Sequence, residues 1–517
     1  MDLRVPIGTL LEDRADASPN KLFITPVEAP DAAVTYGDFN VRANAVAHSL
    51  ADLGVHAGRF VACMASNSIE YLLVSYALKK LGAVEVLIHP EARGAVLTRA
   101  LNLTPASILV ASTEVVSAVA DVAHQLEGKL DTLITIGQCD PVPHVLSGWT
   151  SAGFADLASS AQRANPPRCV SEADVASIVF TSGTTGTAKG CQLSHRYAVN
   201  CAEQQVRLVG QSEADRLYSL LPFAHVAGAY YDVLGTILTG AHLVLRPRYS
   251  TTHFWADVRE HRVTVAGVYG FMAKMLYDRP PTPGDEDHEV RVLGCDVGPI
   301  PHREFARRFG IPRMVNAYGS TEAGLPIGDQ SDERREGSCG QPYTSLYDVA
   351  VVDDYDYPVR TGEVGELVFR PRQPNIMFQG YYGQPEATLS SQSNLWFHSG
   401  DLARMDGEDN VYLVGRKKEM IRRRAENVSV YEVEEALYRH PAVADCAAVG
   451  VPNDFGDQDV GVAVVLHDGV ELEIAALRSY CLKEMPRFMA PDHIQVVGSI
   501  PRTPLGKIDR SRLLDFS

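Results

Sequence analysis

The sequence predicts an α/β protein, built as a large N-terminal domain of two doubly wound α/β subdomains plus a small β-rich subdomain, followed by a small α+β C-terminal domain. Apolar strand-like runs alternate with amphipathic helical segments as far as about residue 350, where short strands around Asp and Gly turns replace them. One strong amphipathic segment and two apolar runs follow residue 417. Alternating strands and helices are typical of parallel sheets covered by helices. We therefore expect an N-terminal domain over residues 1–416 and a C-terminal domain over 417–517.

The first α/β subdomain is expected to lie within the first 170 residues. Apolar positions at helical or strand spacing predict a helix over Asn40–Leu53, a strand over Phe60–Met64, a helix over Ser68–Leu81, and strands over Val84–Ile88 and Ser107–Ala111. Residues 137–170 contain four prolines and are expected to form a surface loop.

The second α/β subdomain is expected to begin near Ala176 and to end near Ala350. Beyond the β-rich segment, the C-terminal domain is predicted to contain a helix over Tyr431–Arg439 and strands over Asp445–Val451 and Val460–Leu466. A further helix and a basic tail interrupted by prolines complete it. About a hundred residues is an ordinary size for such a domain.

Composition excludes several classes of function. The formal net charge of -17 argues against a nucleic-acid-binding protein, which needs a basic face. The nine cysteines are scattered without a C-x-x-C pair, which is typical of reduced thiols. The first residues lack the pattern of a signal peptide, and no apolar run approaches the roughly 18 residues of a membrane span. We therefore expect a cytoplasmic protein; its oligomeric state is left open.

A loop rich in Ser, Thr and Gly follows the apolar strand Ile178–Phe180. Glycines let the backbone approach a polyphosphate, hydroxyls add donors, and a lysine supplies a positive charge. The residues concerned are Thr181, Ser182, Gly183, Thr184, Thr185, Gly186 and Lys189. The loop is not a Walker A motif, because Ala188 and Gly190 stand where that motif needs Gly and Ser or Thr. It predicts a phosphate-binding site.

The same loop, TSGTTGTAKG, resembles the signature of the adenylate-forming superfamily, which includes acyl-CoA synthetases, nonribosomal peptide adenylation domains and luciferases. Other segments resemble further motifs of that superfamily in the same order. They are LPFAHVAG at 221–228, YGSTE at 318–322, GEVGEL at 362–367, GYY at 380–382, SGDL at 399–402, VGRKK at 414–418 and PRTPLGKI at 501–508. The resemblance spans essentially the whole chain and implies an ATP-dependent, AMP-forming ligase.

The resemblance implies a role for each matching residue in nucleotide binding. Thr181–Gly186 and Lys189 would hold the β- and γ-phosphates, where oriented donors stabilise leaving-group charge. Thr321 would donate to the α-phosphate and Glu322 would hold Mg²⁺, a hard cation that needs few protein carboxylates when phosphates also bind it. Asp401 and Arg416 would bind the ribose. Tyr318 would stack on adenine, with Gly298 on the other side. ATP and Mg²⁺ are thus the implied cosubstrate and metal.

The resemblance also implies a moving C-terminal domain. Lys507 would bridge the substrate carboxylate and the α-phosphate, two anions that repel at attack distance. Lys418 matches the hinge, about which the domain would rotate after adenylation so that a different face covers the adenylate. His225 would stand at the carboxylate end of the acid pocket. Candidate pocket-lining residues are Tyr230, Tyr231, Asp232, Tyr269 and Phe271.

The acceptor of the activated acid is left open by the sequence. Arg422, Arg423 and Arg424 can bind the phosphates of coenzyme A, and Asn427 matches a position near the transfer site. Ala425, however, stands where similar CoA ligases usually carry glycine. A side chain there can narrow the tunnel for the pantetheine arm. One hypothesis is an acid–CoA ligase. Another keeps adenylation but changes the acceptor: loading of a carrier protein, amide synthesis, or activation of nitrite for an aryl amine, as in related diazotases. A non-catalytic nucleotide-binding relative is disfavoured, because all the polar residues above are present.

Overall fold

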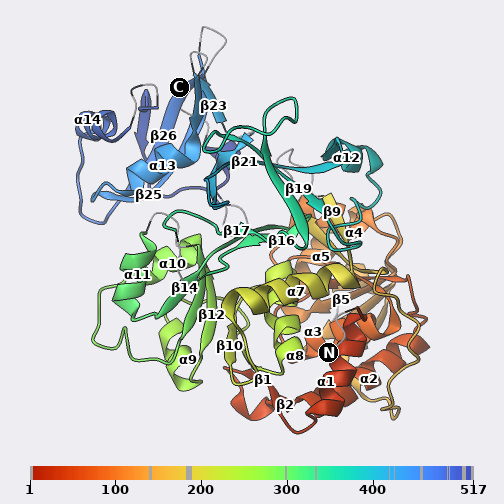
Figure 1. Cartoon of the computed structure of the whole chain (residues 1–517). Helices are drawn as coiled ribbons and strands as arrows, with labels where there is room; N and C mark the ends of the chain where they lie inside the picture. The colour runs from red at the N-terminus through yellow and green to blue at the C-terminus, as the bar shows by residue number, and fades with distance from the viewer. Residues whose placement is uncertain are drawn as a thin grey trace.

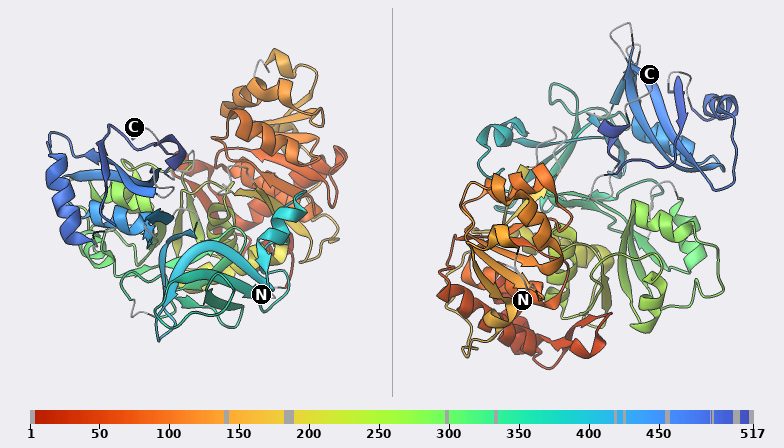
Figure 2. Two further views of the ribbon diagram at one scale, coloured as in Figure 1. Left: turned by 90° about the horizontal axis from the view of Figure 1, so that it is seen from above. Right: turned by 180° about the vertical axis from the view of Figure 1, so that it is seen from behind.

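The computed structural model describes residues 4–138, 143–181, 189–296, 300–331, 335–417, 420–423, 426–453, 458–485, 487, 489–502 and 508–513. Two large, mostly parallel sheets form the N-terminal part, as the sequence predicts (Figure 1). A β-rich region follows them, and a small α+β unit ends the chain at the opposite side of the molecule from the N-terminal helices (Figure 2). The predicted fold class is confirmed.

The first sheet has the strand order β7-β6-β5-β3-β4-β8-β9. Its strands are β3 (Phe60–Met64), β4 (Val84–Leu87), β5 (Ile108–Ser112), β6 (Thr132–Ile136), β7 (Thr150–Gly153), β8 (Val175–Thr181) and β9 (Lys189–Ser194). All pairs are parallel except β8 with β9. The expectation that a second subdomain begins near Ala176 is therefore wrong, because that strand pairs with β4 of the first sheet. Strand pairing is decided by contacts between segments distant in sequence. The alternation of strand and helix segments along the chain does not reveal those contacts.

The second sheet has the order β14-β13-β12-β10-β11-β1-β2. Its strands are β1 (Leu22–Pro26), β2 (Val34–Thr35), β10 (Arg216–Ser219), β11 (His242–Leu245), β12 (Val265–Tyr269), β13 (Val292–Asp296) and β14 (Arg313–Val315). Only the edge pair β1–β2 is antiparallel among these strands. The chain thus contributes its first strands to the sheet that is otherwise built after residue 215.

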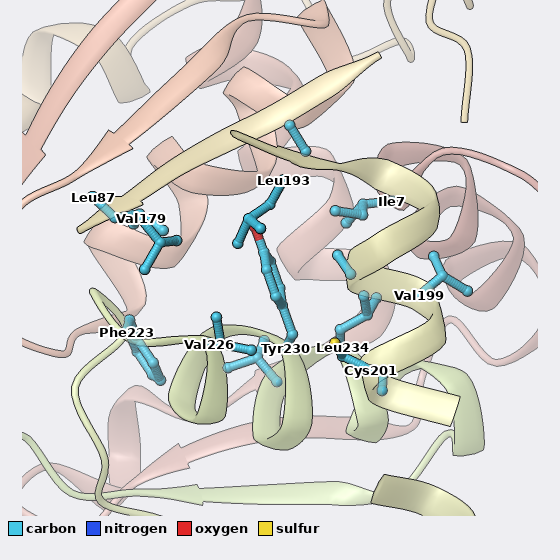
Figure 3. Packing of buried hydrophobic residues seen from close by; sticks show 14 of the residues in the cluster. Ile7, Leu87, Val179, Leu193, Val199, Cys201, Phe223, Val226, Tyr230 and Leu234 are labelled. Carbon is cyan, nitrogen blue, oxygen red and sulfur yellow. The ribbon is translucent and has the colours of Figure 1, made fainter. Parts of the chain in front are cut away.

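A shared layer of helices and their apolar side chains separates the two sheets. It contains α1 (Ile7–Ala17), α2 (Tyr36–Asp52), α3 (Ile69–Leu81), α7 (His195–Val209) and α8 (Gly235–Thr239). The outer face of the first sheet packs on α4 (Gly94–Leu103) and α5 (Val116–Val122), and that of the second on α9 (Phe254–Glu260), α10 (Gly270–Tyr277) and α11 (His302–Phe309). Figure 3 shows part of the shared layer, where the Tyr230 ring lies between Leu87 and Val179 of β4 and β8 on one side and Val199 and Cys201 of α7 on the other. In the described ranges, none of the helices combines the length and apolarity needed to cross a membrane.

Local sequence sets the ends of these helices. Ser68 and Ser194 cap α3 and α7 by accepting a hydrogen bond from the backbone N–H three residues on, which satisfies one of the free N–H groups of the first turn. Gly82 and Gly210 end the same helices in left-handed conformation, at φ 68° and 59°. The predicted helix over Ser68–Leu81 is thus confirmed with Ser68 as its cap.

The predicted surface loop over residues 137–170 is partly wrong. The segment contributes β7 as an edge strand of the first sheet and a short helix, α6 (Phe154–Ala158). Leu157 of α6 is buried, and the Ser49 hydroxyl of α2 donates to its carbonyl. In the sequence, the four prolines lie before β7 and after α6, not within either element. Their number therefore did not indicate a loop over the whole segment.

The remaining strands confirm the β-rich region and the C-terminal α+β unit. A three-stranded sheet contains β15 (Ala317–Ser320), β16 (Gly324–Gly328) and β17 (Gln341–Pro342). A five-stranded sheet contains β18 (Tyr347–Val352), β19 (Gly365–Pro371), β20 (Gln392–Ser393), β21 (Trp396–Met405) and β22 (Val411–Arg416), with α12 (Pro385–Ser390) beside it. The C-terminal unit contains β23 (Met420–Arg423), β24 (Glu426–Ser429), α13 (Val430–Tyr438), β25 (Val443–Pro452), β26 (Gln458–Leu466), α14 (Ile474–Glu484) and β27 (His493–Val496).

Candidate active site

A cavity of about 1770 Å³ lies where the carboxyl ends of the strands of both large sheets meet the β-rich region and the C-terminal unit. It is reached by residues that end or directly follow β3, β8, β10, β11 and β14. Ligands of parallel α/β sheets bind outside the carboxyl ends of the strands, because the loops there carry the variable polar groups. The topology therefore predicts a binding site at this position, and most of the described candidate residues line it.

One end of the cavity gathers groups suited to a polyphosphate and a metal ion. Thr181 ends β8, Lys189 begins β9, and both line the cavity with Thr321 and Glu322. The Lys189 ammonium lies 4.6 Å from the centroid of the Tyr381 ring, and the Tyr381 hydroxyl donates to Glu322 Oε1 at 2.8 Å. The pairing of β8 with β9 thus carries the lysine back beside the acidic residue of the YGSTE segment.

A second group of polar residues is built by the pairing of β21 with β22. Asp401 and Arg416 are opposite one another in this antiparallel pair, and Arg416 Nε lies 3.0 Å from Asp401 Oδ1. The Tyr318 hydroxyl donates to Asp401 Oδ2 at 2.6 Å. Asp401 is therefore fixed in orientation by two donors, while carboxylate oxygens keep further acceptor sites for a ligand's hydroxyl groups.

Tyr318 is held as a flat wall of the cavity. Its ring stacks on Phe369 of β19, with centroids 5.6 Å apart and planes 20° from parallel. Burial, together with the neighbouring Asp401 carboxylate, raises the pKa of its hydroxyl well above the usual range, so this phenol stays a hydrogen-bond donor. An aromatic ring in this position can stack on a planar base.

The LPFAHVAG segment forms the entry to a π-helix, Ala227–Leu234. Asn67 clamps the preceding turn, since its amide donates to Leu221 O at 2.7 Å and its side-chain oxygen accepts from Phe223 N at 2.8 Å. A Cβ at Gly228 would lie 2.5 Å from Pro222 O, so only glycine lets the helix start this close to the turn. The π-helix is a rare geometry that occurs mostly at functional sites.

His225 stands just before this helix and is exposed to the cavity. Its Nδ1 accepts a hydrogen bond from Ala227 N at 3.1 Å, which fixes the orientation of the ring. The sequence-based expectation that His225 faces the binding site is supported by this position.

The prediction that Tyr230 lines the acid pocket is wrong. Tyr230 is 3% exposed and packs edge-on against Tyr197 of α7 in the shared helical layer, as Figure 3 shows for its ring among Val226, Leu234 and Phe223. Its hydroxyl hydrogen-bonds Ser177 of β8. Desolvation raises the pKa of the phenol, which suits a structural hydrogen bond rather than contact with a ligand.

The next two residues face the other way, into the cavity. Tyr231 and Asp232 both line it. Ser219 of β10 donates to Asp232 Oδ2 at 2.9 Å, and desolvation raises the pKa of this carboxyl group to about 7. Tyr269 ends β12 and Phe271 belongs to α10, but their side chains are outside the described part of the structure.

The C-terminal unit closes one side of the cavity through α13 and the residues near the end of the chain. Tyr431, Glu434 and Arg510 line the cavity, and Arg510 Nη2 lies 2.6 Å from the Glu434 carboxylate. Lys417, the last residue before the predicted hinge, contacts Glu366 of β19 at 3.0 Å and Asp354 at 2.9 Å. The chain is thus anchored to the β-rich region up to that residue.

Several predicted site residues lie outside the described residues. They are Ser182, Gly183, Thr184, Thr185, Gly186, Gly298, Lys418, Arg424, Ala425 and Lys507. Arg422 and Asn427 are opposite one another in the β23–β24 pair, with only their backbones described.

Sequence reasoning missed two contributors to the site. Tyr381 was recognised as part of a GYY segment without a role, although its position between Lys189 and Glu322 makes it a bridge. Ser219 lies in β10 without any motif, and only the strand's position beside the π-helix brings it to Asp232. The first could have been found from the segment's resemblance, whereas the second had no sequence signal.

The charges at the nucleotide end fit a metal bound together with phosphates. No cluster of three or more His, Cys, Asp or Glu side chains suited to a metal is present among the described residues. Glu322 offers one carboxylate to the cavity, and its Oε1 accepts a hydrogen bond from Tyr381. A Mg²⁺ ion commonly takes one or two carboxylates and completes its shell with phosphate oxygens and water.

Comparison with protein families gives two matches. A family model for the AMP-binding enzymes matches residues 11–382. A model for the C-terminal domain of AMP-binding enzymes matches residues 432–507.

Individual proteins of known name are also similar to this chain in sequence or in structure. Crotonobetaine/carnitine–CoA ligases of Salmonella typhimurium (strain LT2) and Salmonella heidelberg (strain SL476) are each 29% identical over 487 residues, covering 93% of this chain and 92% of the relative. A crystal structure of an anthranilate CoA ligase in complex with anthranoyl-AMP superposes with a TM-score of 0.87 at 23% identity, covering 99% of this chain and 97% of the other. A benzoate CoA ligase from Burkholderia xenovorans LB400 superposes with a TM-score of 0.86 at 22% identity, covering 99% and 100%. At such identity the structural likeness concerns the fold.

Proposed function

Because the chain belongs to the family of AMP-binding enzymes, we propose that it is an acid–CoA ligase that activates a carboxylic acid as its acyl-adenylate. The family makes it an ATP-using, AMP-forming ligase. The observation that carries the proposal is the cavity that joins Lys189, Thr321 and Glu322 to the Asp401–Arg416 pair and continues to His225. One continuous space thus has groups for the phosphates and the ribose, and room for an acid beside them.

In the proposed adenylation step, the substrate carboxylate attacks the α-phosphorus of ATP and pyrophosphate leaves. Thr321 donates to the α-phosphate, and Lys189 with the Thr181–Gly186 loop neutralises the charge that develops on pyrophosphate. Asp401 accepts from the ribose hydroxyls, and Tyr318 lies against the adenine. Tyr381 keeps the Lys189 ammonium and Glu322 in place, through the ring and the hydroxyl respectively.

Mg²⁺ is proposed as the metal of this site, with Glu322 as its protein ligand. When bound, it would neutralise phosphate charge and fix the triphosphate for attack. Glu322 is oriented for that role by the hydroxyl of Tyr381.

Lys507 is proposed to deliver the charge that lets the two anions approach. Arg510, three residues further on, lines the cavity, and three residues span at most about 11 Å of chain. Arg502, on the other side of the segment 503–507, is anchored to Asp445 at 2.7 Å. The described residue Arg510 thus brings this part of the chain to the cavity wall, which supports the proposal.

The domain boundary at 416/417, with Lys418 as the hinge, is likewise proposed. Lys417 is tied to Glu366 and Asp354, so rotation of residues beyond it would leave β22 and its Arg416 in place. A few residues that absorb a large change in backbone angles are the expected form of such a hinge. The rotation would take Lys507 out of the site and bring another face of the C-terminal domain to it for the second step, transfer to the acceptor.

Coenzyme A is proposed as the acceptor, because the curated relatives with 29% identity over nearly the whole chain are CoA ligases. Arg422 and Asn427 are proposed to lie along its path, together with Arg424 and Ala425, which stand between them in the sequence. A thiol such as coenzyme A stays reduced in a reducing compartment. Seven described cysteines of this chain form no disulfide, and six of them are buried. We therefore propose the cytoplasm as the location.

A screen of pyrophosphate and AMP release tests this function. Short-chain, aryl and amino-substituted acids, and nitrite with an aryl amine, are incubated with ATP and Mg²⁺, with and without CoA. We expect slow AMP release without CoA, faster turnover with it, and a thioester product. AMP release that CoA does not accelerate, with no thioester, would exclude CoA as the acceptor while leaving adenylation intact. Release only with nitrite and the amine would establish the alternative acceptor.

A further inference from the structure

Asp232, a half-buried carboxylate of the cavity wall, differs from four buried carboxylates of the N-terminal part. Lys79 contacts Glu85 at 2.8 Å, Lys80 contacts Glu12 at 2.7 Å, and Arg291 contacts Asp215 at 2.6 Å; Arg246 pairs with Asp257. Each of these acids has a cation, as burial of a charge requires. Among the described residues, the polar contact of the Asp232 side chain is with the neutral hydroxyl of Ser219.

Among the described residues, the elements that pack around Asp232 bring no positively charged side chain into contact with it. The π-helix packs on α7, α8 and β10. α8 carries no ionisable residue, and in α7 Arg196 bonds Gln373 while Arg207 pairs with Glu203; His195 accepts from Ile7 N. In β10, Tyr218 donates to Asp257, and Arg216 begins the strand at its far end. The pKa of Asp232 is shifted by burial and by Ser219 alone.

The space in front of Asp232 is enlarged by two glycines. Gly267 of β12 and Gly294 of β13 are paired directly opposite one another, and both line the cavity. A Cβ added to either would meet only a backbone oxygen, at 3.9 Å. Leu217 and Val265 of the same sheet add apolar side chains to the lining. A ligand group can therefore enter between the strands and the π-helix.

Tyr231 adds an aromatic ring to the same wall. A carboxylate beside an aromatic ring is a common arrangement for binding an organic cation, since the ring face attracts the positive charge and the carboxylate neutralises it. An apolar pocket with a single charged group also fixes which end of a ligand enters first.

We propose that Asp232 is a specificity-determining residue, and that the acid activated by this enzyme carries a positively charged nitrogen at the end remote from its carboxylate. The proposal rests on the proposed function, because it identifies the substrate class of that site. The ligand's cation supplies the kind of partner that the four paired carboxylates find within the protein. A neutral acid would leave Asp232 protonated or unpaired.

Pairs of acids that differ only in charge test the proposal. One pair is a straight-chain acid ending in a trimethylammonium group and its analogue with carbon in place of nitrogen; the second is an amino-terminated acid and its methyl-terminated analogue. With wild-type enzyme we expect kcat/KM for pyrophosphate release to favour the charged member of at least one pair by about tenfold or more. The two pairs distinguish a quaternary from a primary ammonium group.

Two variants separate the role of Asp232 from a general effect of charge in the cavity. Asp232→Asn should abolish the preference for the charged acid while retaining turnover of the neutral one. Glu114→Gln, which removes a different cavity carboxylate, should leave the preference unchanged. Equal loss of preference in both variants, or a wild-type preference for the neutral acids, would overturn the proposal while leaving the ligase function intact.

A binding measurement gives a readout that does not depend on turnover. Titration of the wild-type enzyme with the trimethylammonium acid, with a non-hydrolysable ATP analogue present, should release protons at pH 6.5, because the cation favours ionised Asp232. Calorimetry in buffers of different ionisation enthalpy measures that release. Asp232→Asn should release none, and equal proton release from the variant would contradict the proposal. If no acid of either charge causes pyrophosphate release, the proposed function itself fails.

Discussion

The carboxylates at the two ends of the cavity differ in their hydrogen-bond and ion-pair partners. At the nucleotide end, both oxygens of Asp401 have partners in Arg416 and Tyr318, and Glu322 is held by Tyr381. At the acid end, Asp232 has one neutral partner. ATP has the same shape and charge in every turnover, so its binding groups are oriented before it arrives, which avoids reorganisation in the transition state. At the acid end, the Asp232 carboxylate is instead left to pair with a charge on the substrate. Selectivity for a cationic acid follows from that pairing.

The largest effect is expected from removing Lys507, the lysine proposed to bridge the substrate carboxylate and the α-phosphate. Lys507→Ala should lower the rate of adenylate formation about a thousandfold, because charge stabilisation and orientation at the attacking oxygen are lost together. Transfer from a supplied acyl-adenylate to CoA should change less than about twofold. Rapid-quench measurement of each half-reaction checks both.

The control for that variant is Lys483→Ala, which removes an exposed lysine of α14 from the same domain. It should leave both half-reactions unchanged. Equal losses in the two half-reactions of Lys507→Ala would contradict the alternation of the C-terminal domain.

The next largest effect concerns the oriented carboxylate at the nucleotide end. Asp401→Asn removes a charge-assisted acceptor and weakens its contact with Arg416, so kcat/KM for ATP should fall about a hundredfold. The KM for the acid should stay within about twofold, since the acid end is untouched. Steady-state kinetics with each substrate varied in turn gives the comparison. Asp409→Asn in the exposed β21–β22 turn serves as the control, and a matching fall there would remove the argument for the ribose site.

The acid end should respond to pH where the nucleotide end does not. Burial raises the pKa of Asp232 to about 7, so in the free enzyme the group is largely protonated at pH 6 and largely ionised at pH 8. The KM for a cationic acid should therefore fall about tenfold from pH 6 to 8. Asp232→Asn should flatten this profile. A flat profile for the wild-type enzyme would contradict a titrating carboxylate at the acid end.

The same group should influence stability in the opposite direction. The folded pKa lies above the unfolded value, so the folded state holds more protons between about pH 4 and 7, and stability falls as pH rises through that window. Relative to wild type, Asp232→Asn should therefore become more stable as pH increases. Thermal unfolding at several pH values measures the difference.

The smallest expected effect tests how firmly the Glu322 carboxylate is oriented at the nucleotide end. Tyr381→Phe keeps the ring beside Lys189 but removes the hydroxyl that donates to Glu322, so the Mg²⁺ concentration for half-maximal rate should rise about fivefold. Tyr382→Phe is the matched control, because Tyr382 packs on Phe60 instead. An unchanged Mg²⁺ dependence in Tyr381→Phe would show that the hydroxyl does not orient Glu322.

Much of the nucleotide end was predictable from sequence because its residues lie within motifs. Thr321 and Glu322 are adjacent in the chain, and the β21–β22 pair brings Asp401 to Arg416 through a short hairpin. Five elements of the first subdomain, α2, α3, β3, β4 and β5, were also predicted, since their apolar spacing is regular. Membership of β8 in the first sheet was not, because its partner β4 lies some 90 residues earlier.

The acid end was less predictable because its geometry is irregular. Tyr230, Tyr231 and Asp232 are consecutive, and a residue spacing of 3.6 per turn does not apply in a π-helix, so the sequence could not show that the first faces the core and the other two the cavity. In the part of the chain that the structure describes, the lack of a cation in contact with Asp232 results from how three elements pack around it. Such facts depend on tertiary contacts rather than on local pattern.

The central claim is that the acid's own carboxylate attacks the α-phosphorus of ATP within this cavity. Supplying the acid with a heavy oxygen isotope in its carboxyl group, and measuring the mass of the AMP formed, tests it directly. We predict one labelled oxygen in the phosphate of AMP. Label that appears instead in inorganic phosphate or pyrophosphate, with AMP unlabelled, would contradict the account.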